Sequence, residues 1–163
     1  GKGRFLREIP ISQLGEDKQE EMSKNLERYS LYEAYEVRQV LETKAMDLIV
    51  RNATDSDLDE VETAYQTMLL RFAETNTTTG EFELHQLYAK KTGSVFMEQT
   101  LNIVLSTILE MMHTTSHNVM DMHQVEEEKA DHRRIIDALH KRDSSAAQQA
   151  MYDHIQHTLD ILQ

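Results

Sequence analysis

Apolar residues recur every three or four positions along most of this chain, which is the spacing of amphipathic helices. From Ser30 onward the pattern continues almost without interruption, and each apolar stripe predicts a helix face turned toward a core. Helices of this kind pack side by side in antiparallel order, so the sequence predicts an all-α bundle of about six to seven helices. We expect helices over residues 31–52, 55–75, 80–92, 94–113, 124–141 and 144–163.

Helix-starting signals set several of these boundaries. Ser30 with Glu33, and Thr78 with Glu81, have the spacing of a capping box, in which two side chains bond the first free backbone amides. Gly93 follows the third predicted helix and is a typical C-terminal stop. We therefore expect the first helix to begin just after Ser30 and the third shortly after Thr78.

Residues 1–29 differ in composition from the rest of the chain. They contain three of the five glycines, the only proline and a basic cluster, followed by the polar run EDKQEEMSKN. This composition predicts an extended tail and a linker, joined to a single helical domain over residues 30–163.

Composition narrows the class of protein further. The chain has 163 residues, enough for one domain, and a formal net charge of −12, which argues against contact with DNA phosphates by this chain alone. It has no cysteine, so disulfides, thiolate metal sites and cysteine nucleophiles are excluded. No apolar stretch is long enough for a membrane span or a secretory signal, so we expect a cytoplasmic protein without a membrane partner.

The eight histidines are informative because of the helix faces on which they fall. At about 100° per residue, His132 lies in the middle of one apolar face and His154 lies at the edge of another. His85 shares a face with apolar residues of the third helix, and Glu81 lies one turn before it. Three predicted helices therefore each turn a histidine inward, and one of them adds a carboxylate.

Buried imidazoles and carboxylates need partners, because unpaired polar groups destabilise a core. One divalent cation bound by Glu81, His85, His132 and His154 would satisfy all four. Three imidazoles and a carboxylate suit a transition metal, with zinc favoured over nickel, manganese or iron, and calcium a poor fit. The alternative is that each histidine is a hydrogen-bonded core residue, and helix periodicity alone leaves both interpretations open.

Arg38 lies at the border of the apolar stripe of the first predicted helix. An arginine in such a place either pairs with a carboxylate of a neighbouring helix or presents its guanidinium to an anionic ligand inside the bundle. From the residues alone, pairing is the favoured interpretation.

Four segments carry a family resemblance: LYEAYEVRQVLETKAMDLIVRNATDSDLDEV, EFELHQLYAKKTGS, DHRRIIDAL and HKRDSSAAQQAMYDHIQ. From about Leu31 to its end, the chain resembles the effector-binding FCD domain of GntR-family bacterial transcription regulators, in the FadR-type branch. The resemblance implies a homodimer of six- or seven-helix bundles. It also implies an interior metal held by Glu81, His85, His132 and His154.

The resemblance further implies that the metal and Arg38 together hold a small carboxylate effector. Two departures from the family pattern bear on this site. The family usually has Asp or Asn at the position of Glu81, and many members have an arginine on the fourth helix, which is lacking here. The effector would then be less anionic, or Asn102, Ser106 or Thr107 would contact it instead.

The N-terminus fits the same family. Its members carry a winged helix-turn-helix before this domain, and GKGRFL resembles the strand that ends the wing. We therefore expect that the DNA-binding domain is absent from this chain and that the intact protein binds DNA only through it. A cloning remnant is the alternative origin of the first residues.

The leading hypothesis is a ligand-sensing domain, not an enzyme, that changes DNA binding when an effector enters the bundle. A metal-dependent enzyme is one alternative, but only Glu110-Met-Met-His113 matches a di-iron motif, and no nucleophile elbow or phosphate-binding loop is present. A purely structural metal, or a dimerisation bundle without an effector, is the other alternative.

Overall fold

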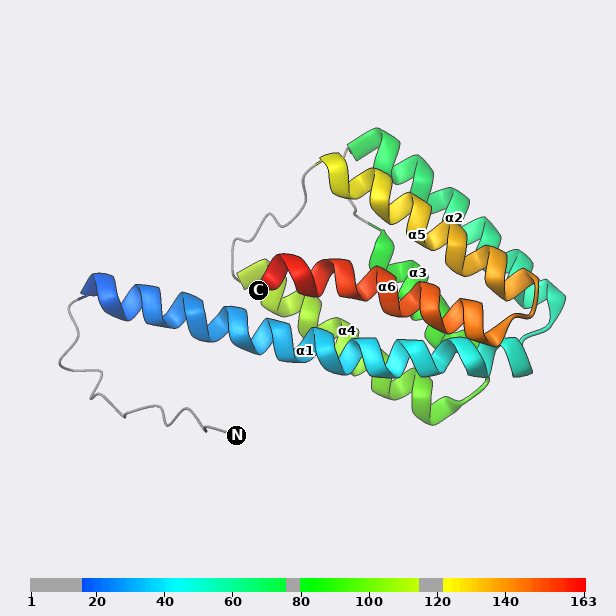
Figure 1. Ribbon diagram of the computed structural model, residues 1–163, viewed down its shortest axis with the longest axis horizontal. Coiled ribbons are helices and arrows are strands. Elements are labelled where there is room, and N and C mark those ends of the chain that lie inside the picture. Colours follow the sequence, from blue (N-terminus) through cyan, green and yellow to red (C-terminus); the bar gives the residue numbers. More distant parts are fainter. Residues whose placement is uncertain (1–15, 76–79, 115–121) are drawn as a thin grey trace.

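The structure, a computed structural model, describes residues 16–75, 80–114 and 122–163. Over these residues the chain forms helices only, which confirms the all-α prediction. The helices are α1 (Glu16–Asn52), α2 (Asp55–Thr75), α3 (Glu81–Lys91), α4 (Val95–Thr114), α5 (Met122–His140) and α6 (Ser144–Leu162) (Figure 1).

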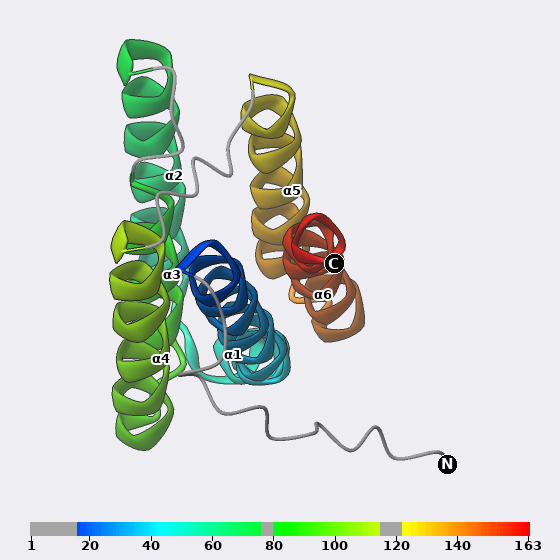
Figure 2. The same ribbon diagram turned by 90° about the vertical axis from the view of Figure 1, so that its left-hand side faces the viewer.

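The long helix α1 organises the bundle. It packs between α6 and α4 (Figure 2), and its N-terminal part extends beyond both partners (Figure 1). Helix α5 packs between α6 and α2, and the short helix α3 contacts α1, α2 and α4. Helix α3 therefore lies among the longer helices, where its side chains can meet those of α1, α5 and α6.

The core is built from the apolar stripes that the sequence predicts. On α5, for example, Ile135, Ile136 and Leu139 are fully buried, and Leu84 and Tyr88 are buried on α3. Removing each large aliphatic side chain from water contributes about 1.5–3 kcal/mol to folding. Along the described helices, none is both long and apolar enough to cross a membrane.

The first helix begins earlier than the sequence pattern predicts. Helix α1 starts at Glu16, so Ser30 lies inside the helix and its capping-box spacing marks no helix end. Of the extended tail and linker expected over residues 1–29, residues 16–29 are helical, because Glu, Lys, Gln and Met are good helix formers even without an apolar stripe. The predicted wing strand at residues 1–6 lies outside the described residues.

Other helix starts have specific caps. At α2, Thr54 and Asp57 cap each other, with the Asp57 amide donating to the Thr54 hydroxyl at 3.1 Å. At α6, the Asp143 carboxylate accepts a bond from the Ala146 amide at 2.9 Å, as the sequence predicts. Helix α3 instead begins after Gly80, whose φ of 107° is left-handed, with no side-chain cap. The predicted cap Thr78 lies outside the described residues.

Candidate metal centre

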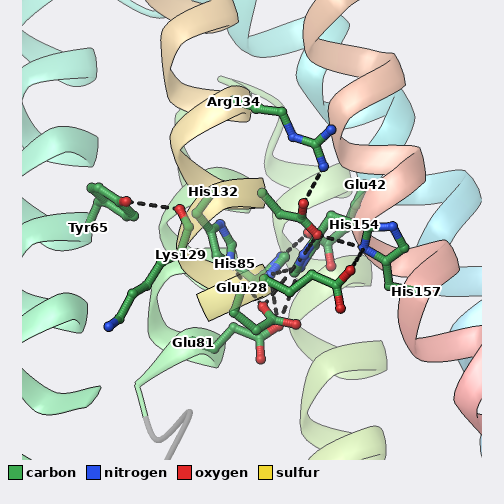
Figure 3. Close-up of polar contacts among 12 residues, drawn as sticks. Glu42, Tyr65, Glu81, His85, Glu128, Lys129, His132, Arg134, His154 and His157 are labelled. Atoms are coloured by element: carbon green, nitrogen blue, oxygen red, sulfur yellow. Dashed lines mark hydrogen bonds and ion pairs between the residues drawn. The ribbon is translucent and has the colours of Figure 1, made fainter. Parts of the chain in front are cut away.

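Four buried side chains from three helices converge inside the bundle. Glu81 and His85 project from α3, one turn apart, while His132 comes from α5 and His154 from α6. Each is at most 4% exposed, and one donor atom of each lies within 4.8 Å of the donor atoms of the other three (Figure 3). These are the four residues that the helix faces point inward, and the fold brings all of them together.

The separations within this cluster match those between the ligands of one metal ion. Nε2 of His85 lies 3.2 Å from Nε2 of His154 and 3.3 Å from Oε1 of Glu81, and Nε2 of His154 lies 3.5 Å from the same oxygen. Donor atoms bound tetrahedrally at about 2.0–2.1 Å from zinc are about 3.3 Å apart. The donor set therefore fits a small divalent cation in size and in chemistry.

The outward nitrogen of each imidazole faces a second partner. Nδ1 of His85 contacts the Glu42 carboxylate, Nδ1 of His132 lies 3.3 Å from the Tyr88 hydroxyl, and Nδ1 of His154 lies 3.5 Å from Oδ2 of Asp131. Partners of this kind fix the ring orientation of metal-binding histidines and favour the tautomer that leaves the other nitrogen free. All three imidazoles thus turn Nε2 toward the centre of the cluster.

Three buried atoms at this site have no hydrogen-bond partner among the described residues. They are Nε2 of His132, Oε2 of Glu128 and Nδ1 of His154; the glutamate oxygen lies 3.8 Å from the first nitrogen and 3.6 Å from the second. A buried polar atom without a partner costs about 1–3 kcal/mol. A cation at the centre would remove this cost at His132, which supports a metal over a set of self-sufficient core histidines.

Arg38 joins the cluster from α1. It is 1% exposed, its Nε donates to Oε1 of Glu42 at 2.6 Å, and its Nη2 reaches Oε1 of Glu81 at 3.4 Å. The rings of Tyr35 and Phe82 lie 5.2 and 5.1 Å from the guanidinium carbon, close enough for cation–π attraction. The pairing expected of Arg38 is therefore present, with one carboxylate on its own helix and one on α3.

Two ionised carboxylates lie beside the cluster. Burial opposes ionisation of Glu42, but His85 and Arg38 lower the pKa of its carboxyl to about 2. Burial likewise opposes ionisation of Asp131, yet His154 and Arg134 lower the pKa of that carboxyl to about 2. Two carboxylates beside the imidazoles are thus ionised at neutral pH, and they offset the charges of Arg38 and Arg134.

The surroundings shift the pKa values of His154 and His132 in opposite directions. Burial disfavours a charge on His154, but Glu128, Asp131 and Glu81 together raise the pKa of His154 to about 10. Burial, and then the neighbouring His154 and His85, lower the pKa of His132 well below its usual range. Without a metal, the cluster holds positive charge at His154 and excludes it from His132.

The three α4 residues predicted to face an effector differ in placement. Asn102 is half-buried, and its Oδ1 is buried without a hydrogen-bond partner among the described residues. Ser106 and Thr107 are exposed, and their hydroxyls donate to the Asn102 and Ile103 carbonyls of their own helix at 2.7 and 2.8 Å. Of these three residues, only Asn102 thus has a buried polar atom that is free to bond an effector.

Sequence reasoning missed three carboxylates of the site: Glu42, Glu128 and Asp131. Glu42 follows Arg38 by one turn and Glu128 precedes His132 by one turn, so helix periodicity could have placed both beside residues already singled out. Asp131 is adjacent to His132 in sequence but contacts the histidine of another helix, His154. No local signal predicts that contact.

Comparison with known proteins gives the family. The sequence profile of the FCD domain matches residues 33–157, which is most of the chain. The chain belongs to the FCD-domain family of GntR-type transcription regulators. It is therefore the ligand-sensing domain of a regulator and not an enzyme.

Individual relatives of this FCD domain are distant. The HTH-type transcriptional regulator LutR of Bacillus subtilis (strain 168) is 23% identical over 167 residues, which cover 99% of this chain and 74% of LutR. Among solved structures, Streptococcus agalactiae GntR has a TM-score of 0.66 at 19% identity, over 93% of this chain and 63% of that one. E. coli McbR/YncC has a TM-score of 0.65 at 16% identity, over 80% of this chain and 62% of that one. The chain thus spans less than two thirds of each of these two structures, and the likeness to them shows the shared fold.

Proposed function

We propose that this FCD domain senses a small carboxylate effector through a divalent transition metal held by Glu81, His85, His132 and His154. The observation that carries the proposal is the convergence of three Nε2 atoms and one carboxylate oxygen, with an outer partner behind each imidazole. Zinc is favoured by this set of four, and nickel, manganese and iron also suit it. The bound metal would supply a Lewis-acidic centre for an effector oxygen.

Arg38 is the residue proposed to meet the effector carboxylate. Its guanidinium is buried beside Glu81 and stays charged, since Glu42 and then Tyr35 and Glu81 raise its pKa against the effect of burial. A planar guanidinium suits a carboxylate because it donates two parallel bonds. Asn102 on α4 would add a polar contact, whereas Ser106 would do so only after a rearrangement of α4, because it is exposed.

The proposed response is a shift in helix packing that changes DNA binding by linkage. An effector that binds one arrangement of the bundle more tightly shifts the population toward that arrangement. In the intact cytoplasmic protein, this shift would alter the spacing of two winged helix-turn-helix domains on an operator. Those domains, and not the acidic chain described above, would contact the DNA.

A homodimer is part of this proposal. Large apolar side chains are exposed on the neighbouring helices α1 and α4, including Val40 at 70%, Phe96 at 81% and Ile103 at 68% exposure. Clusters of exposed apolar residues are typical of surfaces that a protein partner covers. A monomeric mass in light scattering at micromolar concentration would contradict this part of the proposal.

The central experiment combines metal analysis with thermal shift. The purified chain is loaded with zinc and heated with a panel of small organic acids, with and without metal. We expect at least one acid to raise Tm only when metal is present, and Arg38→Ala to abolish that increase while metal stays bound. Arg51→Ala is the matched control, because Arg51 lies on the same helix, is exposed, and pairs with Asp47 instead.

The outcomes separate the ligand sensor from a purely structural metal and from a bundle without metal. A metal-loaded chain that no acid stabilises would leave a structural metal as the better interpretation. A chain that binds no transition metal would contradict the proposed centre itself.

A further inference from the structure

The Glu128 carboxylate is the one buried acid at the centre whose role the four-residue site leaves unexplained. It is 8% exposed, and its Oε2 has no hydrogen-bond partner among the described residues. The other buried acids of the site have partners: Glu42 and Glu81 bond Arg38, and Asp131 bonds Arg134. A buried carboxyl oxygen without a hydrogen-bond partner costs about 1–3 kcal/mol.

The position of Glu128 directs it toward the proposed metal. It lies one turn before His132 on α5, so both side chains project from the same face of that helix. Its Oε2 is 3.8 Å from Nε2 of His132 and 3.6 Å from Nδ1 of His154, and Figure 3 places it among the side chains of the cluster. Oε2 of Glu128 and Nε2 of His132 are both buried, both without a hydrogen-bond partner, and face each other.

The same arrangement occurs on α3, where Glu81 lies one turn before His85 and both belong to the cluster. Two helices thus each carry an acid and, one turn later, a histidine of the cluster. On α3 the oxygen and nitrogen of this pair are 3.3 Å apart, and on α5 they are 3.8 Å apart. A cation between the two pairs would compensate both acids at once.

We infer that Glu128 is a fifth protein ligand of the metal, a role that rests on the metal centre proposed above. The donor set then becomes three imidazoles and two carboxylates. Zinc in protein sites is usually four-coordinate, whereas manganese, iron and nickel readily accept five or six ligands. Glu128 would therefore shift the preference of the site from zinc toward a six-coordinate ion, and would leave one coordination position for an effector oxygen.

The test uses the whole chain loaded with Co²⁺, whose visible absorption is intense with four ligands and weak with six. Glu128→Gln keeps the shape but weakens the donor, and Glu128→Ala removes it. We expect the wild type to absorb weakly and both variants to absorb more strongly. Both variants should also lose affinity for Co²⁺ by more than the roughly 10–100-fold that loss of an outer partner costs. Added acetate should move the Glu128→Ala spectrum back toward that of the wild type, because it replaces the missing carboxylate.

Two control variants make the result decisive. Glu127→Gln changes the preceding, exposed glutamate of the same helix and should leave affinity and spectrum unchanged. Asp131→Asn removes an outer partner of His154, so it should weaken binding without changing the spectrum. Glu128 variants that behave like either control would overturn the inference.

Metal preference and folding give independent readouts. The ratio of Mn²⁺ to Zn²⁺ affinity should fall at least about tenfold in Glu128→Gln, and an unchanged ratio would count against a fifth ligand. Metal-free Glu128→Gln should have a Tm close to that of the wild type, because the amide keeps the shape of a side chain whose Oε2 has no hydrogen-bond partner to lose. If the wild type binds none of these metals, the result contradicts the proposed metal centre itself and not only the role of Glu128.

Discussion

The three central histidines differ in the partners of their ring nitrogens. His85 has Glu42 behind it, His132 has Tyr88, and His154 has the side chain of Asp131. Only His132 faces the cluster with an Nε2 that has no hydrogen-bond partner among the described residues. Its environment therefore fits a metal ligand better than it fits a hydrogen-bonded core histidine.

Substitution of single ligands should abolish metal retention. We expect His132→Ala and His154→Ala each to lose bound transition metal after dialysis, as measured by elemental analysis, because the remaining donors hold the ion much more weakly. His140→Ala is the matched control, since His140 is an exposed residue of α5 and lies outside the cluster. Full metal content in both ligand variants would show that the ion binds elsewhere.

At the scale of single helices, apolar periodicity predicted most of the fold. It placed α2 through α6 to within a few residues, because each has an apolar stripe that is buried against its neighbours. It failed at the start of α1, where residues 16–29 are helical without such a stripe. A pattern based on burial cannot detect a helix end that depends on helix propensity.

The candidate site was predictable only in part for a related reason. A helix face tells which side chains point inward, and this was sufficient for Glu81, His85, His132 and His154. It does not tell which atoms meet across helices, so the contact of Glu42 with His85 and of Asp131 with His154 required the packed structure.

Two ion pairs of a single lysine connect the end of α3 to the start of α2. The buried ammonium of Lys91 contacts Asp57 at 2.7 Å and Glu60 at 2.6 Å. The bond from Lys91, and then those from the Thr54 amide and hydroxyl, lower the pKa of Asp57 well below its usual value. The contact therefore depends on an ionised Asp57.

The contribution of Asp57 to stability should depend on pH in a defined direction. A carboxyl whose pKa is lower in the folded state stabilises the fold above its unfolded pKa of about 3.9, and this stabilisation is lost as pH falls toward the folded value. Asp57→Asn should thus lower Tm at pH 7, with the difference from wild type shrinking below about pH 4. Asp59→Asn, an exposed neighbour on α2, should have little effect. An equal difference at every pH would contradict the role of the charge.

On the scale of the whole molecule, the candidate centre connects helices that are far apart in sequence. Its four residues come from α3, α5 and α6, and Arg38 with Glu42 adds α1 through direct contacts to Glu81 and His85. Four of the described helices therefore meet at one point in the interior. A metal there would act as a cross-link that the unfolded chain lacks.

Removal of the metal should destabilise the entire bundle. An ion that binds only the folded state stabilises it by about 2.7 kcal/mol when its free concentration is 100 times Kd. Treatment with a chelator should then lower Tm in a single cooperative transition, and re-addition of metal should restore it. Chelator-treated His132→Ala should show no further decrease, which separates loss of the bound ion from side effects of the chelator.

The length of α1 has a mechanical consequence. The helix contains neither glycine nor proline over 37 residues, so it has no sequence feature that would allow a sharp bend. At 1.5 Å per residue, its first residue Glu16 lies about 33 Å along the axis from Arg38. A tilt of about 5° at Arg38 would displace Glu16 by about 3 Å. The helix would then act as a lever arm, turning a small adjustment at one buried guanidinium into a movement as large as the width of an atom.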